Sequence, residues 1–245
     1  KEKNLEQLKS AVQENGADIG FAFDGDGDRV GMITNRGDSV LADHLIMILS
    51  EHYLKKKKGA IIFDVKCSSQ LPILIENFGG TAIMEKTGHF NIKKAIKKYN
   101  AILGGEMSGH IFINHDWYGF DDAIYTAVML AKVISDTGQP ASSVIEQFPK
   151  TFTTPELNLD VDDVSKFKMV EKFKEQMKFP GAEFNTIDGV RVSIGSSGGL
   201  MRASNTSPKL VFRFEAESKK DLEKIRSLFA LNLKNIFPDL KLDFN

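Results

Sequence analysis

Three carboxylates occupy alternate positions of one short acidic loop (residues 24–29). Asp24, Asp26 and Asp28 are separated by glycines and followed by Arg29. Carboxylate oxygens are hard ligands of the kind that Mg²⁺ and Ca²⁺ prefer. The glycines remove side-chain bulk, so the backbone can fold closely around one cation. Because three clustered carboxylates repel one another without a cation, the loop is predicted to bind a divalent metal ion.

Other interpretations of the acidic loop fit less well. An EF-hand has glycine at loop position six and glutamate at position twelve, where this chain has Arg29 and Asn35. A phosphatase of the haloacid-dehalogenase type would use Asp24 as its nucleophile. Such an enzyme carries threonine or valine where Asp28 stands, so this interpretation stays open as a weaker alternative, as does an ordinary acidic turn.

Three further segments carry polar side chains near glycines or strand ends. The Glu106 loop (residues 104–110, Gly-Gly-Glu-Met-Ser-Gly-His) offers a carboxylate, a hydroxyl and an imidazole at alternate positions, a set that can hold sugar hydroxyls. The Thr87 turn (residues 87–89, Thr-Gly-His) places His89 where it can donate to an anion. Lys66 ends a predicted strand, where catalytic groups collect in α/β sheets. Taken singly, each also has an ordinary explanation as a capping or solvated side chain.

A fourth polar segment, the Arg202 loop (residues 202–208, Arg-Ala-Ser-Asn-Thr-Ser-Pro), combines a guanidinium with short hydroxyl and amide side chains. A turn of this composition offers backbone amides, hydroxyls and a charged donor to a phosphate group. The preceding residues 195–199 (Gly-Ser-Ser-Gly-Gly) are expected to be flexible backbone. The alternative is a polar hairpin turn that binds nothing.

The elements that must position these loops follow two patterns. A strand is predicted at residues 30–34, directly after the acidic loop. Between residues 42 and 136, segments of helical period alternate with short apolar strands, one of them at 101–103, which predicts an α/β domain with helices over a mixed sheet. Residues 148–155 contain two prolines and no helical period, so a domain boundary is expected there. Beyond it, strands near 156–161, 187–194 and 209–215 and helices near 163–178 and 218–234 predict a smaller α+β domain.

Composition excludes several classes of protein. With 42% hydrophobic and 27% charged residues, the 245-residue chain is typical of folded globular proteins. Its 32 basic and 33 acidic residues give no overall attraction for nucleic acid. The single cysteine, Cys67, excludes a disulfide framework and a four-cysteine zinc site. No apolar stretch is long enough to span a bilayer and no signal peptide opens the chain, so a cytoplasmic protein without a membrane partner is expected.

In order and spacing, the loops DGDGDR, GEMSGH and RASNTSP resemble those of the α-D-phosphohexomutase superfamily, most closely its bacterial phosphomannomutase/phosphoglucomutase group. The resemblance covers essentially the whole chain. It implies that residues 1–38 are a remnant of the family's domain 2 with the metal loop. Residues 39–150 would be the sugar-binding αβα domain 3, and residues 151–245 the phosphate-binding domain 4, whose fold is TATA-binding-protein-like. Met107 and residues 205–207 depart from the phosphoglucosamine mutase branch, which favours a hexose over a hexosamine.

The resemblance also implies roles for individual residues. One Mg²⁺ would be held by Asp24, Asp26 and Asp28, with a phosphoserine oxygen as its fourth partner. Arg29 would lie beside that phosphate, and Lys66 would assist proton transfer at the sugar hydroxyl. The residues implied to bind substrate are Thr87, Gly88, His89, Glu106, Ser108 and His110, together with Arg202, Ser204, Asn205 and Thr206 for the phosphate that is not transferred.

The implied activity is interconversion of hexose 1-phosphate and hexose 6-phosphate, of mannose or glucose, through a phosphoserine and a hexose 1,6-bisphosphate. The family's serine lies in a Thr-x-Ser-His-Asn pattern of an N-terminal domain. Ser68–Ser69 and Ser196–Ser197 lack the His-Asn context. We therefore expect a fragment that depends on missing N-terminal domains of the same chain and is inactive alone. A non-catalytic phosphosugar-binding module is the alternative, and the phosphatase a weaker one.

Overall fold

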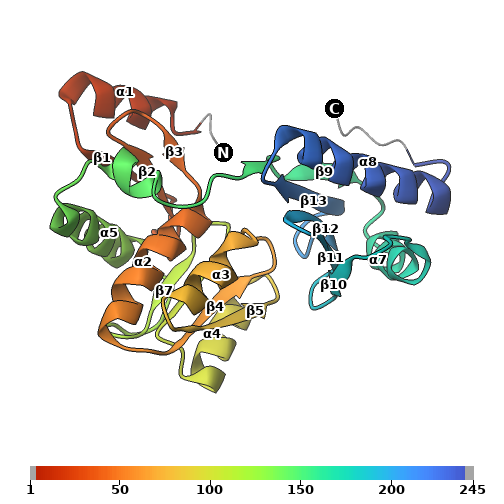
Figure 1. The fold of residues 1–245 in the computed structure, drawn as a ribbon, viewed down its shortest axis with the longest axis horizontal. Coiled ribbons are helices and arrows are strands. Elements are labelled where there is room, and N and C mark those ends of the chain that lie inside the picture. The colour runs from red at the N-terminus through yellow and green to blue at the C-terminus, as the bar shows by residue number, and fades with distance from the viewer. Residues whose placement is uncertain (1–3, 241–245) are drawn as a thin grey trace. The chain divides into compact units, whose positions relative to one another are not determined.

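The computed structural model describes residues 4–240. The chain divides into two compact units, Lys1–Pro149 and Lys150–Asn245 (Figure 1). Between residues 4 and 240, no helix combines the length and the apolar character needed to cross a membrane.

The first unit opens with α1 (Glu6–Asn15) and a three-stranded antiparallel sheet. Its strands are β1 (Ile19–Phe23), β2 (Val30–Thr34) and β3 (Ser39–Val40). In the register of the first pair, Phe23 lies opposite Val30. The acidic loop is therefore the connection of a β-hairpin, and the two strands fix both of its ends.

A four-stranded sheet forms the larger part of the first unit. It contains β4 (Ala60–Asp64), β5 (Thr81–Glu85), β6 (Leu103–Gly105) and β7 (Ile111–Ile113), in the spatial order β5-β4-β6-β7. The first three strands run parallel, and β7 is antiparallel to β6. Because successive side chains of a strand point to opposite faces, this sheet has two faces to bury.

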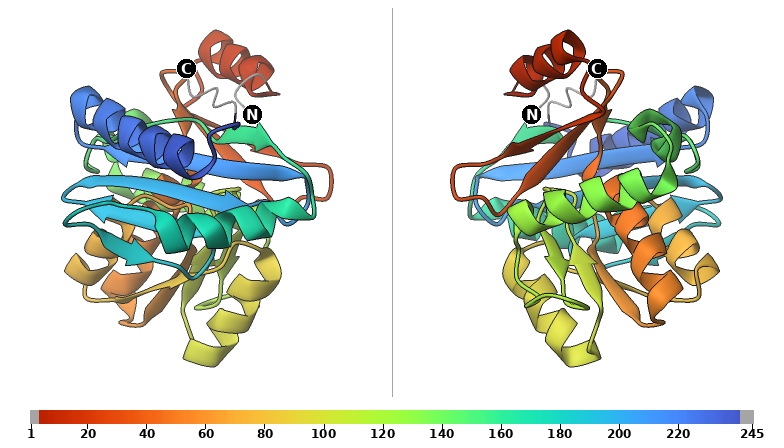
Figure 2. Two further views of the ribbon diagram at one scale, coloured as in Figure 1. Left: turned by 90° about the vertical axis from the view of Figure 1, so that its right-hand side faces the viewer. Right: turned by 90° about the vertical axis from the view of Figure 1, so that its left-hand side faces the viewer.

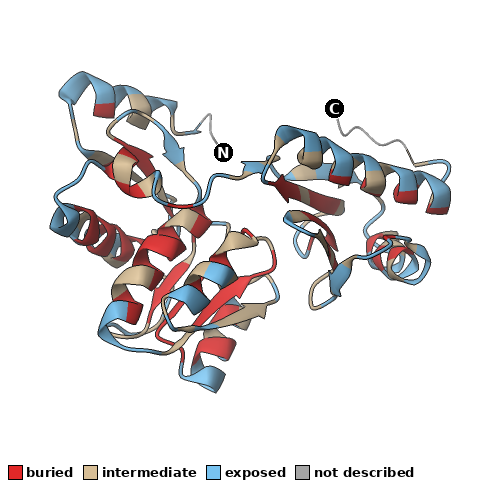
Figure 3. Ribbon diagram, in the orientation of Figure 1, coloured by how far each residue is buried: buried red, intermediate tan, exposed pale blue. Residues whose placement is uncertain are grey.

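Helices cover both faces of that sheet (Figure 2). On one face, α2 (Ala42–Lys56) and α3 (Gln70–Asn77) share a hydrophobic core with Ile61 and Phe63 of β4. On the other, α4 (His89–Tyr99) packs on Ile62. The core on the α2 side also includes α5 (Ala123–Thr137) and the short α6 (Ala141–Ile145), and Figure 3 shows how completely the central strands are buried. The result is an α/β/α arrangement.

The strand order explains where the polar segments of this unit lie. Strand β4 has β5 on one side and β6 on the other, and all three are parallel, so their carboxyl ends meet at one edge. Lys66 follows β4, the Thr87 turn follows β5, and Glu106 follows β6. In open α/β sheets, ligands bind at this edge, where the strand order reverses.

The second unit is an antiparallel sheet with two long helices. Its strands are β8 (Phe152–Thr153), β9 (Leu157–Asp160), β10 (Glu183–Asn185), β11 (Val190–Ile194), β12 (Ser197–Ala203) and β13 (Lys209–Ala216). Helices α7 (Ser165–Gln176) and α8 (Lys219–Ile236) share one core with it. At its centre, the ring of Phe229 lies 4.9 Å from Phe179 and 5.1 Å from Phe214. This separation of helices from an antiparallel sheet is an α+β fold, so the predicted fold class is confirmed.

Two glycine-containing segments differ from the sequence-based expectation. Residues 195–199 were expected to be flexible, but Ser197–Ala203 form β12, in which Gly198 and Gly199 are buried. A Cβ atom on Gly199 would lie 2.4 Å from the Phe229 ring, so glycine is needed there for close packing. The strand expected at 101–103 lies at Leu103–Gly105 instead, where a Cβ on Gly104 would lie 2.7 Å from Ile96. In both places, tertiary packing decides the structure.

Candidate functional site

The acidic loop brings its three carboxylates together. The ligand oxygens of Asp24, Asp26 and Asp28 all lie within 4.8 Å of one another. Asp24 Oδ1 accepts hydrogen bonds from the backbone amides of Asp28 (3.2 Å) and Arg29 (3.1 Å), and Arg29 Nε donates to Asp24 Oδ2. These bonds curl the loop so that the carboxylates converge.

The charges in the acidic loop are unevenly balanced. Burial raises the pKa of Asp24, but the hydrogen bonds from Arg29 outweigh it and lower that pKa to about 2. Burial raises the pKa of Asp28, with neighbouring Asp24 and Asp26 adding to the increase and His110 opposing it. A divalent cation bound by oxygen ligands would neutralise this excess negative charge. The donor set therefore fits a hard cation such as Mg²⁺.

The Glu106 loop lies directly against the acidic loop. Val30, the residue after Arg29, donates its amide hydrogen to the carbonyl of Gly109 (3.2 Å). Gly109 has a φ of 100°, and a Cβ there would lie 2.9 Å from the Val30 carbonyl, so only glycine permits this approach. His110 Nδ1 consequently lies 3.6 Å from Asp28 Oδ2. Two segments about eighty residues apart in the sequence (Asp28 and His110) form one polar surface.

Asp121, which the sequence analysis did not single out, joins the two imidazoles. Its Oδ2 atom lies 3.0 Å from His89 Nδ1 and 3.3 Å from His110 Nδ1, and its Oδ1 accepts from Lys93 Nζ (3.0 Å). Burial raises the pKa of Asp121, but the hydrogen bonds from Lys93 and His89 outweigh it and lower that pKa. Burial lowers the pKa of His110, and the charges of Asp28 and Asp121 partly oppose this. The only sequence signal was the acidic pair before a helix, which is typical of an N-cap; Asp122 is that cap.

Glu106 links the Glu106 loop to the Thr87 turn. Its side chain is buried, and its Oε1 atom accepts the backbone amide hydrogen of Gly88 at 2.6 Å. Burial raises the pKa of Glu106, and the Gly88 hydrogen bond opposes the increase. Lys66 lies at the same edge, with its Nζ atom 3.9 Å from Asp64 Oδ2, whereas Ser108 is exposed. The structure thus brings the predicted residues of the first unit to one edge of the sheet.

Glu106→Gln is expected to change how stability depends on pH. The pKa of Glu106 is higher in the folded chain than in the unfolded chain, so folding favours the protonated carboxyl group. The free energy of unfolding therefore falls as the pH rises from the unfolded-state pKa through the folded-state pKa. Glutamine can still accept from Gly88 but does not ionise. Urea unfolding at about pH 4 and about pH 8 should therefore show the variant gaining stability relative to the unaltered chain at the higher pH. The exposed Glu76→Gln is the control, and an unchanged pH slope in Glu106→Gln would contradict the expectation.

In the second unit, Arg202 is a buried cation with unused hydrogen-bonding capacity. Its side chain is only 6% exposed, and its Nε donates to Asp188 Oδ2 (3.0 Å). Its Nη2 atom is buried and has no hydrogen-bond partner among residues 4–240. A buried donor without a partner is costly, and an anionic ligand would remove that cost.

The backbone next to Arg202 is folded into a tight turn. Ser204 Oγ accepts from the amides of Thr206 (3.3 Å) and Ser207 (3.2 Å). Asn205 and Thr206 are exposed at the tip of that turn. The Arg202 loop therefore presents polar groups beside a buried guanidinium, and this combination suits a phosphate group.

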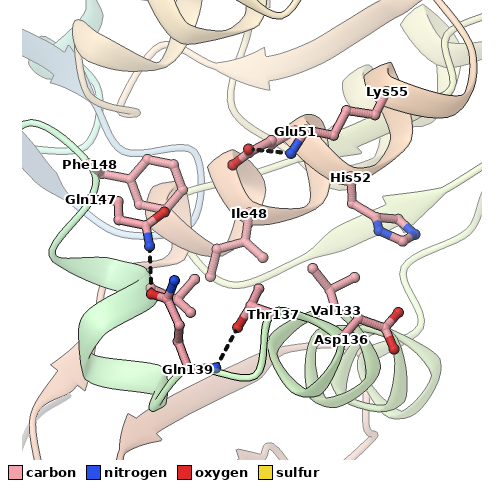
Figure 4. Close-up of a pocket in the computed structure, with 11 residues that line it drawn as sticks. Ile48, Glu51, His52, Lys55, Val133, Asp136, Thr137, Gln139, Gln147 and Phe148 are labelled. Carbon is pink, nitrogen blue, oxygen red and sulfur yellow. Dashed lines mark hydrogen bonds and ion pairs between the residues drawn. The ribbon is translucent and has the colours of Figure 1, made fainter.

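A pocket of about 350 Å³ lies elsewhere in the first unit, among α2, α5 and α6 (Figure 4). Ile48, Val133 and Phe148 contribute its apolar wall. Its charged groups form their own ion pairs, such as Glu51 with Lys55 at 2.7 Å. None of the sequence-predicted site residues lines this pocket.

Three domain models of one family match consecutive parts of the chain. Phosphoglucomutase/phosphomannomutase alpha/beta/alpha domain II matches residues 1–37, alpha/beta/alpha domain III matches 42–152, and the C-terminal domain matches 156–231. The chain belongs to the phosphoglucomutase/phosphomannomutase family, within the phosphohexomutase superfamily. The resemblance inferred from the three loops is confirmed.

Individual relatives agree with this assignment. The phosphomannomutase/phosphoglucomutase of Pseudomonas putida is 49% identical over 245 residues, which are 100% of this chain and 53% of that protein. The phosphoglucomutase of Neisseria gonorrhoeae is 43% identical over 94% of this chain and 50% of its own length. The crystal structure of a family protein from Burkholderia thailandensis superposes with a TM-score of 0.93 and 39% identity, covering 99% of this chain and 52% of that one. This phosphohexomutase-family chain thus spans about half the length of the relatives that it matches.

Proposed function

We propose that these 245 residues supply the metal-binding, sugar-binding and phosphate-binding loops of a phosphohexomutase that interconverts hexose 1-phosphate and hexose 6-phosphate. The observation that carries the proposal is the convergence of the acidic loop with the Glu106 loop, through the Val30–Gly109 hydrogen bond and the approach of His110 to Asp28. This places hard cation ligands beside groups that suit sugar hydroxyls. A relative at 49% identity carries the name phosphomannomutase/phosphoglucomutase.

In this proposal, each group has a role that its surroundings support. Asp24, Asp26 and Asp28 hold one Mg²⁺, which when bound neutralises charge on the phosphoryl group in transfer. Arg29 offers its guanidinium beside that ion, and Lys66 exchanges a proton with the reacting hydroxyl. The substrate-binding residues are Thr87, Gly88, His89, Glu106, Ser108 and His110 for the sugar and Arg202, Ser204, Asn205 and Thr206 for the other phosphate. A distantly related Aspergillus fumigatus mutase has been solved with GlcNAc-6P and magnesium, which agrees with this ligand class.

The phosphoryl carrier is proposed to come from other domains of the full-length protein. No Thr-x-Ser-His-Asn pattern occurs in the 245 residues, and the curated relatives are about twice as long as the chain. A hexose monophosphate would then accept the phosphoryl group from the serine to form hexose 1,6-bisphosphate, and this intermediate would return its other phosphoryl group to the serine. We propose that the 245 residues bind hexose phosphate without converting it.

The phosphatase alternative needs Asp24 as a free nucleophile. In the structure, Asp24 Oδ1 accepts two backbone amides and Oδ2 is paired with Arg29. In-line attack by this carboxylate would require breaking that pairing. Asp28, at the position where such a phosphatase carries threonine or valine, also weighs against this alternative.

A ³¹P NMR time course tests the proposal directly. The chain is mixed with Mg²⁺, mannose 1-phosphate and a trace of glucose 1,6-bisphosphate, with Asp26→Asn as the matched variant. We expect saturable broadening of the mannose 1-phosphate signal, no new signal, and weaker broadening with the variant. Mannose 6-phosphate would show that a serine within the chain carries the phosphoryl group, and inorganic phosphate would establish the phosphatase.

A further inference from the structure

Asp64 is a fully buried carboxylate at the carboxyl end of β4, the strand that lies between β5 and β6. Both of its oxygens are used. Oδ1 accepts from the Met107 backbone amide (3.0 Å) and from Cys67 Sγ (3.1 Å), and Oδ2 accepts from Thr87 Oγ1 (3.0 Å). One side chain therefore contacts the segments that follow three neighbouring strands.

These contacts close a ring around the Glu106–Gly88 hydrogen bond. Thr87 precedes Gly88 in the chain, and Met107 follows Glu106. The Gly88 amide donates to Glu106 Oε1 at 2.6 Å. Asp64 thus binds Thr87 through Oδ2 and Met107 through Oδ1, and these two residues are the chain neighbours of Gly88 and Glu106.

We propose that Asp64 is a positioning residue that fixes the Thr87 turn and the Glu106 loop relative to each other, so that the sugar-binding groups are in place before the ligand arrives. That the ligand is a hexose phosphate rests on the proposed function; the positioning itself does not. Asp64 is fully buried and acts through Thr87 and Met107. Its Oδ2 atom also lies 3.9 Å from Lys66 Nζ, so the Lys66 segment belongs to the same arrangement.

The position requires a side chain that accepts hydrogen bonds on both of its polar atoms. Only a carboxylate accepts hydrogen bonds on both oxygens, whereas an amide has one accepting and one donating end. Asparagine has nearly the same shape and can keep the bond to Met107 or the bond to Thr87, but not both as acceptor. Asp64→Asn consequently forces the Thr87 hydroxyl to accept instead of donate, which alters the ring with little change in volume.

The chain contains a matched control. Asp43 is equally buried, lies in the same unit, and accepts the Ser68 backbone amide at 3.0 Å through Oδ2. Asp43→Asn carries the same chemical change and the same cost of altering a buried carboxylate, but the hydrogen bond that it alters is the one from the Ser68 backbone amide. Thr87→Val is a second variant, which removes the hydroxyl that donates to Oδ2 and leaves Asp64 itself unchanged.

The test combines ¹⁵N-resolved amide spectra of the ligand-free chain with titration of mannose 1-phosphate in the presence of Mg²⁺. We expect Asp64→Asn and Thr87→Val to shift the Gly88 amide signal, and Asp64→Asn also to shift the Met107 signal. Asp43→Asn should shift Ser68 and leave Gly88 in place. Affinity should fall about tenfold or more in Asp64→Asn, by analogy with the loss of an outer partner of a metal ligand, and less in Asp43→Asn.

The two proposals fail in different ways. If Gly88 and Met107 keep their signals in Asp64→Asn, or if both Asn variants lose the same affinity, Asp64 has only a structural role. If the unaltered chain does not bind mannose 1-phosphate, the proposed function is wrong, while the amide signals of the ligand-free variants still decide the role of Asp64. If Asp64→Asn does not fold, Thr87→Val tests the proposal instead: a shifted Gly88 amide signal supports the positioning role, and an unchanged signal contradicts it.

Discussion

Replacing Asp26 by asparagine is expected to weaken Mg²⁺ binding by more than about 100-fold, because losing even an outer partner of a metal ligand costs 10–100-fold. Asp26 is exposed, while Asp24 is held by Arg29. The change therefore removes one charged oxygen ligand without disturbing the hydrogen bonds that shape the acidic loop. It also removes a charge that raises the pKa of Asp28, so the total repulsion within the acidic loop falls and the loop has less need of a cation.

Calorimetric titration with Mg²⁺, repeated with Mn²⁺, measures the effect. Asp18→Asn is the control, since Asp18 is also an exposed aspartate of the first unit but lies before β1, outside the acidic loop. We expect it to bind Mg²⁺ as the unaltered chain does. Equal Mg²⁺ affinity in Asp26→Asn and Asp18→Asn would mean that residues 24–29 are an acidic turn, and the metal site would have to be withdrawn.

Sequence analysis found those parts of the site whose shape depends on contacts between residues close together in the chain. The acidic loop is folded by contacts four and five residues apart, from Asp24 to Asp28 and Arg29, so its composition alone indicates that its carboxylates converge. The elements around it follow from hydrophobic period: β2 was predicted with its observed bounds, Val30–Thr34. The turn at the tip of the Arg202 loop is likewise closed by Ser204 over two or three residues.

What sequence analysis missed depends on partners far away in the chain. Asp64 acts through residues 23 and 43 positions later, and Asp121 meets His89 across 32 positions. No spacing pattern marks such residues, because the order of the strands brings their partners to them. The same holds for Gly199, whose neighbour Phe229 belongs to the last helix. The role of an isolated buried aspartate at a strand end can be recognised only when the sheet topology is known.

Arg202→Gln is expected to reduce the affinity for mannose 1-phosphate by about 10- to 100-fold, because a hydrogen bond to a charged group contributes about 1.5–3 kcal/mol. The guanidinium is buried, and its Nη2 atom has no partner within residues 4–240. A phosphate oxygen that reaches this atom would form a charge-assisted hydrogen bond with it. Lysine restores the charge but not the planar, forked donor geometry, so Arg202→Lys should bind with intermediate affinity.

The main competing explanation is that Arg202 matters only for stability, through its ion pair with Asp188. Asp188→Asn separates the two roles: it weakens that pair but leaves the guanidinium, and with it Nη2, in place. If Arg202 binds phosphate, Asp188→Asn lowers the melting temperature as Arg202→Gln does but keeps most of the affinity. A second comparison uses mannose without a phosphate group. Arg202→Gln should bind mannose as tightly as the unaltered chain does. A loss for both ligands, or an equal loss in both variants, would assign Arg202 to the support of the sheet and leave the Arg202 loop without a phosphate-binding role.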